Sequence, residues 1–179
     1  MNNTVLIGAS SFLGSRITEL YNPRICTLRF EDNENDWLDY GNKNADTDAV
    51  ILLSRTCRKT APRRDRHTML NEVSGISKIL SAFPNTHFVF ASTKVVHGLI
   101  DDHVQLTSRD DIIKQILKSV SGELINTITD FPSTPFNEKS LDDLGLEHQI
   151  YAHTKLCGEH LIKYCAKTYT IFRLWDITN

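Results

Sequence analysis

The segment from Asn3 to Arg16 constrains the fold more than any other part of the chain. Thr4 to Ile7 is a short apolar run typical of a buried strand, and Gly8 ends it. Apolar residues then recur at helical spacing: Phe12, Leu13, Ile17 and Leu20. The segment therefore predicts a strand, a glycine turn and a helix. The N-terminus of such a helix offers backbone N–H groups and a partial positive charge, where a pyrophosphate can sit.

The spacing of this turn is Gly8-x-x-Ser11-x-x-Gly14. It resembles the Gly-x-x-Gly-x-x-Gly turn of the extended short-chain dehydrogenase/reductase superfamily, with Ser11 in place of the middle glycine. At that position a side chain either crowds the pyrophosphate or turns inward and bonds to it. The resemblance implies that a dinucleotide is bound along the turn by Gly8, Ser10, Ser11, Phe12, Leu13 and Gly14. A glycine turn in an unrelated α/β protein is the alternative.

Composition indicates one ordinary globular domain of 179 residues, with 40% apolar and 23% charged residues. A net charge of −2 gives no general electrostatic reason to bind nucleic acid or membrane. We expect a cytoplasmic protein, because no apolar run approaches the ~20 residues of a membrane span and no signal sequence is evident. The spacing of the cysteines indicates reduced thiols and no metal site: Cys26, Cys57, Cys157 and Cys165. A basic cluster predicts a solvated loop, or else a site for an anionic ligand: Arg55, Arg58, Lys59, Arg63, Arg64 and Arg66.

Arg24 to Phe30 predicts a second strand, whose end meets the adenosine ribose in a dinucleotide-binding fold. The guanidinium of Arg29 there suits a 2′-phosphate, which favours NADP slightly over NAD. Glu31 and Asp32 follow at once and could bind the ribose of NAD instead. We interpret Trp37-Leu38 as a brief third strand or a contact with the adenine.

Ala49 to Ser54 predicts a buried strand whose last residues, Leu53 and Ser54, should lie beside the cofactor. His67 to Phe83 carries apolar residues at helical spacing and predicts a long amphipathic helix. Within it, Asn71 to Gly75 resembles the superfamily's Asn-Val-x-Gly segment, except that Glu72 stands where asparagine is usual. The alternation of strands and helices predicts an α/β fold: a doubly wound, Rossmann-type parallel sheet with helices on both faces.

His87 to Ser92 predicts another buried strand, followed by a segment that resembles the Ser-Ser-x-x-Val-Tyr-Gly of the superfamily. The catalytic hydroxyl of that motif lies five residues before the glycine. Counting back from Gly98 gives Thr93, whose hydroxyl can donate and accept as a serine does. His97 replaces the usual tyrosine, and its role stays open.

Tyr151 and Lys155 open a predicted helix, and a spacing of four places their side chains on one face. A free tyrosine has a pKa near 10, and a nearby cation lowers that pKa by stabilising the phenolate. The resemblance implies that Tyr151 exchanges a proton with substrate and that Thr93 bonds the same oxygen. Lys155 would tune Tyr151 and hold the nicotinamide ribose. A solvated helix face is the alternative for this pair.

Thr170 to Ile177 predicts a final strand, which resembles the segment following the catalytic helix in nucleotide-sugar epimerases, dehydratases and reductases. The resemblance implies that Trp175 lies along the nicotinamide and that Asp176 meets substrate. Packing at the end of the strand is the alternative for Arg173 and Trp175.

Residues 99–134 have no counterpart in compact members of the superfamily, although Asp110 to Val120 within them predicts an amphipathic helix. We interpret this insertion, in a single NAD(P)-binding domain spanning 1–179, as a flap near the active site or an oligomer contact. A homo-oligomer is thus an open expectation. Extended members of the superfamily continue into a substrate-binding lobe, whereas this sequence stops at Asn179. We therefore expect the chain to lack that lobe, either as a fragment or as a naturally short protein.

Two functions are consistent with these features. The first is an NAD(P)-dependent epimerase, dehydratase or reductase acting on a nucleotide sugar, and the retention of Thr93, Tyr151 and Lys155 favours it. The second is a non-catalytic dinucleotide-binding protein, a sensor or degenerate relative. Ser11, Glu72 and the expected absence of the lobe favour the second.

Overall fold

Six parallel strands form the central sheet of the computed structural model, which describes residues 3–53, 66–97, 107–131, 141–174 and 177–178. These strands are β1 (Thr4–Ile7), β2 (Arg24–Cys26), β3 (Ala49–Leu52), β4 (His87–Thr93), β6 (Thr127–Phe131) and β7 (Thr168–Leu174). Their order across the sheet is β2-β1-β3-β4-β7-β6, and every pairing is parallel. A separate parallel pair joins β5 (Thr107–Ser108) to β8 (Ile177–Thr178).

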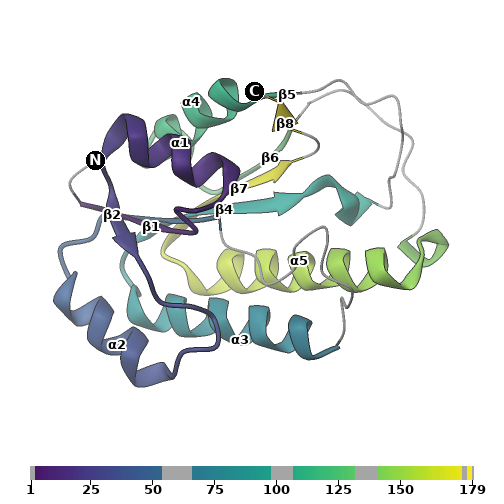
Figure 1. Ribbon diagram of the computed structural model, residues 1–179, viewed down its shortest axis with the longest axis horizontal. Helices are drawn as coiled ribbons and strands as arrows, with labels where there is room; N and C mark the ends of the chain where they lie inside the picture. The colour runs from purple at the N-terminus through teal and green to yellow at the C-terminus, as the bar shows by residue number, and fades with distance from the viewer. Residues whose placement is uncertain (1–2, 54–65, 98–106, 132–140, 175–176, 179) are drawn as a thin grey trace.

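Helices cover both faces of this sheet (Figure 1). They are α1 (Phe12–Tyr21), α2 (Glu34–Lys43), α3 (Arg66–Ala82), α4 (Arg109–Val120) and α5 (Leu146–Cys165), with short 3-10 helices η1 (Lys94–His97) and η2 (Leu141–Asp143). Helices α1 and α4 lie on one face, and α2, α3 and α5 lie on the other. The predicted doubly wound, Rossmann-type sheet is confirmed.

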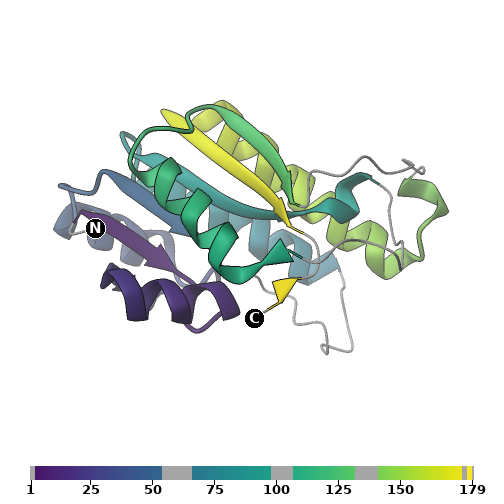
Figure 2. The same cartoon turned by 90° about the horizontal axis from the view of Figure 1, so that it is seen from above.

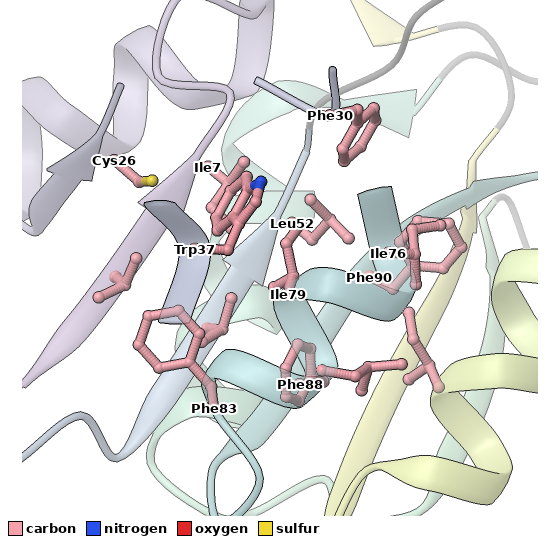
Figure 3. Close-up of a cluster of buried hydrophobic side chains, with 14 of the residues drawn as sticks. Ile7, Cys26, Phe30, Trp37, Leu52, Ile76, Ile79, Phe83, Phe88 and Phe90 are labelled. Carbon is pink, nitrogen blue, oxygen red and sulfur yellow. The ribbon is translucent and has the colours of Figure 1, made fainter. Parts of the chain in front are cut away.

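Alternate side chains of the strands point to opposite faces and build two cores. Val50, Leu52, Phe88 and Phe90 face α2, α3 and α5, and Figure 3 shows the aromatic side chains of this larger core. Leu6, Ile51 and Val89 face α1 and α4. Because the central strands are covered on both faces, they are continuous apolar runs, which made them the most readily predicted elements.

Trp37 belongs to the larger core and not to a strand or an adenine site (Figure 3). It lies in α2 and is fully buried, and its indole N–H donates to the carbonyl oxygen of Arg29 at 3.2 Å. Asn33 caps α2 by accepting from the N–H of Asp36. The prediction of a third strand or an adenine contact at Trp37-Leu38 was therefore wrong. The apolar side chain in this polar stretch lies on the buried face of a helix.

The described part of the expected insertion, residues 107–131, builds α4 and the edge strand β6 instead of a flap. Ile112, Ile113 and Ile116 of α4 pack on the sheet in the same core as α1, and Figure 2 shows the two helices side by side. Strand β6 pairs with β7 along its whole length. The segment is thus part of the domain's own core.

The order of the strands gives two connections an unusual hand. The connections β1-α1-β2, β2-α2-β3 and β3-α3-β4 share one hand, as judged from the direction of each step and the face that its helix covers. The connection β4-α4-β6 moves across the sheet in the same direction as β2-α2-β3, but its helix covers the opposite face. The connection β6-α5-β7 moves back in the same direction as β1-α1-β2, and its helix also covers the opposite face. Both connections therefore have the reverse hand. Nearly all parallel crossovers are right-handed, which makes this pair of reversals a distinctive feature of the fold.

Candidate functional site

The turn between β1 and α1 has the geometry that its glycines predict. Gly8 has a φ of 94°, in the region that favours glycine, and its carbonyl oxygen accepts from the N–H of Ser11 at 3.0 Å. A Cβ added to Gly14 would lie 2.2 Å from the Gly8 carbonyl oxygen. Gly14 therefore permits the close approach of helix and strand, as the sequence predicts. The N–H groups of Phe12 and Leu13 begin the helix, where no intrahelical acceptor exists.

Ser11 turns its side chain inward and caps α1. Its hydroxyl oxygen accepts from the N–H of Gly14 at 3.0 Å, and its backbone is extended, as at a typical N-cap. The Ser11 hydroxyl oxygen is thus used to cap the helix, and its contact with a pyrophosphate stays a prediction. Around it, Ser10 and Phe12 are exposed, whereas Leu13 and Gly14 are buried.

The carboxyl ends of the other strands lie along the same edge of the sheet as this turn. Ile7 is level with Leu52, and the N–H of Leu53 donates to the Ile7 carbonyl oxygen at 2.9 Å. Strand β4 continues three residues beyond this row to Thr93, which is level with Leu174 of β7. At about 3.3 Å per residue, Thr93 stands about 10 Å further along the sheet than Ile7, the last residue before the glycine turn.

Arg29 lies beyond the end of β2 and not within the strand, which stops at Cys26. Its side chain is exposed, while its backbone is held at both ends. The Arg29 N–H donates to the Asp32 carboxylate at 2.7 Å, and Lys78 of α3 donates to the Phe30 and Asp32 carbonyl oxygens at 2.8 and 2.7 Å. The Asp32 carboxylate thus bonds within its own loop, and the guanidinium at this position faces solvent.

Tyr151 packs beside the strand end that carries Thr93. It is half-buried in a small cluster with Val95, Leu144 and Ala152, and Val95 follows Thr93 by two residues. Thr93 is buried, and its hydroxyl oxygen accepts from the Val95 N–H at 3.3 Å. Helix α5 begins at Leu146, so Tyr151 lies in its second turn instead of opening it.

Lys155 forms a buried ion pair with Glu72 of α3. Its Nζ lies 2.6 Å from Glu72 Oε1, and both side chains are almost completely buried. The ammonium also lies 5.1 Å from the centre of the Phe90 ring. Glu72 is the residue that departs from the superfamily's asparagine, and a carboxylate at this position gives the lysine a full counter-charge.

A second buried ion pair lies one turn further along α5, where Glu159 accepts three hydrogen bonds from Arg173 of β7. Arg173 Nη2 is 2.7 Å from Oε2, and Nε is 3.0 Å from Oε1, which also accepts from the Ser92 hydroxyl at 2.5 Å. Hydrogen bonding to Glu159 raises the pKa of the Arg173 guanidinium. Sequence reasoning missed Glu159, although its spacing of four from Lys155 places it on the same helical face.

His97 joins this network from η1, and its role in the structure is polar contact with strands β6 and β7. Its Nε2 lies 3.2 Å from Asp130 Oδ1 and 3.1 Å from Arg173 Nη1. Next to it, burial lowers the pKa of the Lys94 ammonium, and Asp130 partly opposes this shift. Sequence reasoning missed Asp130, because it lies on a strand within residues 99–134, which were expected to form a flap or an oligomer contact.

Several predicted site residues lie outside the described residues. They are Ser54, Trp175 and Asp176, together with the basic residues from Arg55 to Arg64. Within the ranges described, no group of three or more His, Cys, Asp or Glu side chains could hold a metal ion. None of the helices in those ranges is both long and apolar enough to cross a membrane.

The comparisons with known proteins give a likeness in structure alone. No family model matches the chain, and a search of curated proteins gives no significant match. Among solved structures, the Bordetella bronchiseptica enzyme WbmH in complex with NAD+ matches with a TM-score of 0.58 and 16% identity, over 97% of this chain and 55% of that one. RMD from Pseudomonas aeruginosa complexed with NADPH matches with a TM-score of 0.56 and 16% identity, over 96% and 53%.

GDP-mannoheptose C4 reductase from Campylobacter jejuni with NADP bound matches with a TM-score of 0.54 and 12% identity, over 96% of this chain and 51% of that one. The chain thus spans about half the length of the solved structures that it matches. At these identities the likeness concerns the fold, which is the fold that the resemblance to extended short-chain dehydrogenases/reductases implies. This chain therefore has the Rossmann-type α/β fold that these solved structures share.

Proposed function

We propose that residues 1–179 form an NAD(P)-binding domain that acts, as an epimerase, dehydratase or reductase, on a nucleotide sugar in the cytoplasm. The observation that carries this proposal is the turn from Gly8 to Gly14, which bares the tip of α1 at the edge where Thr93 also lies. A pyrophosphate at the tip would accept from the N–H groups of Phe12 and Leu13. The solved structures with NAD+, NADPH and NADP bound support this choice of ligand.

At the adenosine end of the cofactor, Arg29 supports NADP over NAD. Its exposed guanidinium can bind a 2′-phosphate through two N–H groups. The internal bond of Asp32 leaves that carboxylate less suited to a ribose hydroxyl. Leu53, Ser54 and Trp175 are proposed to line the nicotinamide half of the site, and Asp176 is proposed to meet substrate.

Tyr151 is the proposed general acid or base. It would pass a proton to or from the substrate oxygen, while the Thr93 hydroxyl bonds the same atom. The packing of Tyr151 against the cluster of Val95, Leu144 and Ala152 supports this arrangement because the cluster joins α5 to the segment that follows Thr93. A bound nicotinamide would supply or accept the hydride. Lys155 is proposed to act on Tyr151 and on the nicotinamide ribose.

A second function, a non-catalytic dinucleotide-binding protein, is favoured by the pairing of Lys155 with Glu72. A lysine whose charge is offset by a buried carboxylate stabilises a neighbouring phenolate less than a lysine without one. This alternative keeps the binding role of the glycine turn and removes the chemistry at Tyr151.

Hydride transfer separates the two functions. The protein is mixed with NADPH or NADH and a panel of 4-keto nucleotide sugars, and nicotinamide absorbance is followed. A reductase consumes cofactor, whereas an epimerase or a dehydratase returns the hydride and is followed instead by chromatography of the nucleotide sugar. In each case Tyr151→Phe abolishes turnover while leaving cofactor affinity unchanged. Cofactor binding without oxidation of cofactor and without conversion of any nucleotide sugar in the panel would favour the non-catalytic function.

A further inference from the structure

The first residues of α1 and α4 meet at the carboxyl edge of the sheet. The two helices lie side by side on one face, and both begin at this edge (Figure 2). Phe12 opens α1 and Arg109 opens α4, and the guanidinium carbon of Arg109 lies 4.6 Å from the centre of the Phe12 ring. A guanidinium over an aromatic ring is held in place and keeps its in-plane N–H groups for another partner. Arg109 thus places a cation beside the tip of α1.

The junction that carries Arg109 contains polar atoms without a partner. Arg109 itself is half-buried and has neither an ion pair nor a hydrogen bond in the described part of the chain. Its Nε is buried without a hydrogen-bond partner, and so is the hydroxyl oxygen of Thr107, two residues earlier. Buried polar groups without partners are rare in folded proteins, because each costs free energy. Two of them at one junction favour a site that takes a polar ligand.

The carboxylates that follow Arg109 are held by other cations. Asp110 lies 3.6 Å from Arg16 Nε of α1, and Asp111 accepts from Lys114 at 3.0 Å. Arg109 differs from Arg16 and Lys114 because no carboxylate within the described ranges offsets its charge. A guanidinium in these surroundings favours an anion, and the fork of its N–H groups matches the oxygens of a phosphate.

We infer that Arg109 is a phosphate-binding residue: its guanidinium, stacked on Phe12, binds the same diphosphate as the N–H groups at the tip of α1. This inference rests on the proposed function and adds to it a side chain from residues 99–134, the segment without a counterpart in compact members of the superfamily. The diphosphate is common to NADH and NADPH, so Arg109 raises the affinity for both. Arg29, in contrast, is proposed to act on the 2′-phosphate of NADPH.

Titration of the full chain with ADP, NADH and NADPH tests the role of Arg109. Calorimetry measures the binding of ADP, and nicotinamide fluorescence measures that of the two cofactors. Arg109→Gln should bind each of the three ligands about tenfold or more weakly, because charge-assisted hydrogen bonds to the diphosphate are lost. Equal affinities in Arg109→Gln and the unaltered protein would overturn the inference and leave the proposed function standing.

Lys118→Gln is the matched control. It removes the same charge from an exposed position near the other end of α4. We expect its affinity for ADP to equal that of the unaltered protein. A loss as large as that in Arg109→Gln would show that only the net charge of the helix matters, and would overturn the specific role of Arg109.

Phe12→Leu tests the stacking and separates a binding role from a packing role. The variant removes the ring over which the guanidinium lies, so ADP should bind about two- to fivefold more weakly. The same substitution in Arg109→Gln should have almost no further effect, because the ring acts through the guanidinium. Equal losses in the two backgrounds would contradict the arrangement.

Failure of the proposed function gives a different result from failure of this inference. If neither NADH nor NADPH binds, the proposed function is refuted. Binding of ADP that depends on Arg109 would still support the diphosphate site in that case, whereas no binding of ADP would overturn the site as well.

Discussion

Ser11 is the residue at which the glycine turn differs from the superfamily's pattern, and its hydroxyl caps α1. Ser11→Ala should lower the free energy of unfolding by about 1 kcal/mol, because the N–H of Gly14 loses its acceptor. Urea denaturation followed by circular dichroism measures this change.

Ser11→Asp separates capping from ligand binding. Aspartate caps as well as serine, so stability should be preserved, while a carboxylate at the tip of α1 repels a pyrophosphate. We expect a loss of NADPH affinity of tenfold or more, read from nicotinamide fluorescence. Equal affinity in Ser11→Asp and the unaltered protein would place the pyrophosphate elsewhere.

Arg29 sets the proposed preference for NADP. Arg29→Asp should weaken NADPH binding by about tenfold or more relative to NADH, since one charge-assisted hydrogen-bonding group is removed and a like charge faces the 2′-phosphate. Lys118→Asp is the control, with the same change of charge on an exposed residue near the end of α4. An unchanged NADPH to NADH ratio in Arg29→Asp would reject this assignment.

Residue identities predicted the glycine turn well and the buried charges poorly. Gly8 and Gly14 are only six residues apart in sequence, so their roles follow from local geometry. Glu72 and Lys155 are 83 residues apart in sequence, and only the packing of α3 on α5 brings them together. The departure at Glu72 was visible in the sequence, but its partner was not.

At the scale of elements, the contact of α1 with β1 depends on the absence of a side chain at Gly14. Gly14→Ala should destabilise the protein by about 1–3 kcal/mol, because the new Cβ meets the Gly8 carbonyl and the helix must shift. Cofactor affinity should fall with it. Thermal and urea unfolding measure the first effect, and nicotinamide fluorescence measures the second.

Gly145→Ser is the control for this prediction. Among the residues that the structure describes, nothing lies within 4 Å of a Cβ at Gly145, and the position is the N-cap of α5, where serine is favourable. Stability should therefore be unchanged or slightly raised. A Gly14→Ala protein as stable as Gly145→Ser would contradict the close contact between helix and strand.

Elements with strong periodicity were predicted to within a few residues, and their ends less well. Strand β2 stops at Cys26 and not at Phe30. The residues after Cys26 form a loop in which the Arg29 carbonyl oxygen accepts from the Trp37 indole N–H instead of from a neighbouring strand. Helix α5 begins at Leu146, five residues before Tyr151. Its N-cap is Gly145, which has no capping side chain from which the start of the helix could be predicted. Helix ends depend on capping contacts that periodicity does not report.

At the scale of the whole molecule, His87 ties the connection through α4 and β6 to the sheet. Its Nδ1 lies 2.9 Å from the Thr168 hydroxyl of β7, and its Nε2 lies 2.9 Å from the Ser119 hydroxyl of α4. Ser119 in turn donates to Thr170 at 2.6 Å. A single imidazole at the amino end of β4 thus joins two strands and the helix on one face.

Burial lowers the pKa of His87, so the folded protein resists its protonation. Below about pH 6.5 the unfolded chain binds this proton more readily than the folded one does. The stability that the neutral imidazole contributes is therefore present above about pH 6.5 and is lost as the pH falls.

Unfolding in urea at pH 7.5 and pH 5.5 checks this dependence on pH. His87→Gln, which keeps hydrogen-bonding groups but does not titrate, should lose less stability between the two values than the unaltered protein. The exposed His153, replaced by Gln, is the control and should leave the dependence unchanged. An equal dependence in His87→Gln would remove His87 as its source.

The topology explains why residues 99–134 were misread. Consecutive parallel strands usually lie side by side in a sheet and are joined by a right-handed crossover. Here β6 takes the edge and β7 enters between it and β4, with both connections reversed in hand. Local patterns predict the helix within this segment and carry no information on the order of the strands.

The binding of a nicotinamide dinucleotide at the tip of α1 is the central claim, and titration of the folded protein with NADPH and NADH tests it most directly. Nicotinamide fluorescence should change and saturate at sub-millimolar cofactor, with NADPH bound at least as tightly as NADH. Ser11→Asp, folded to the same stability, should bind either cofactor at least tenfold more weakly. No saturable change with either cofactor, from protein whose circular dichroism shows the native fold, would contradict the account.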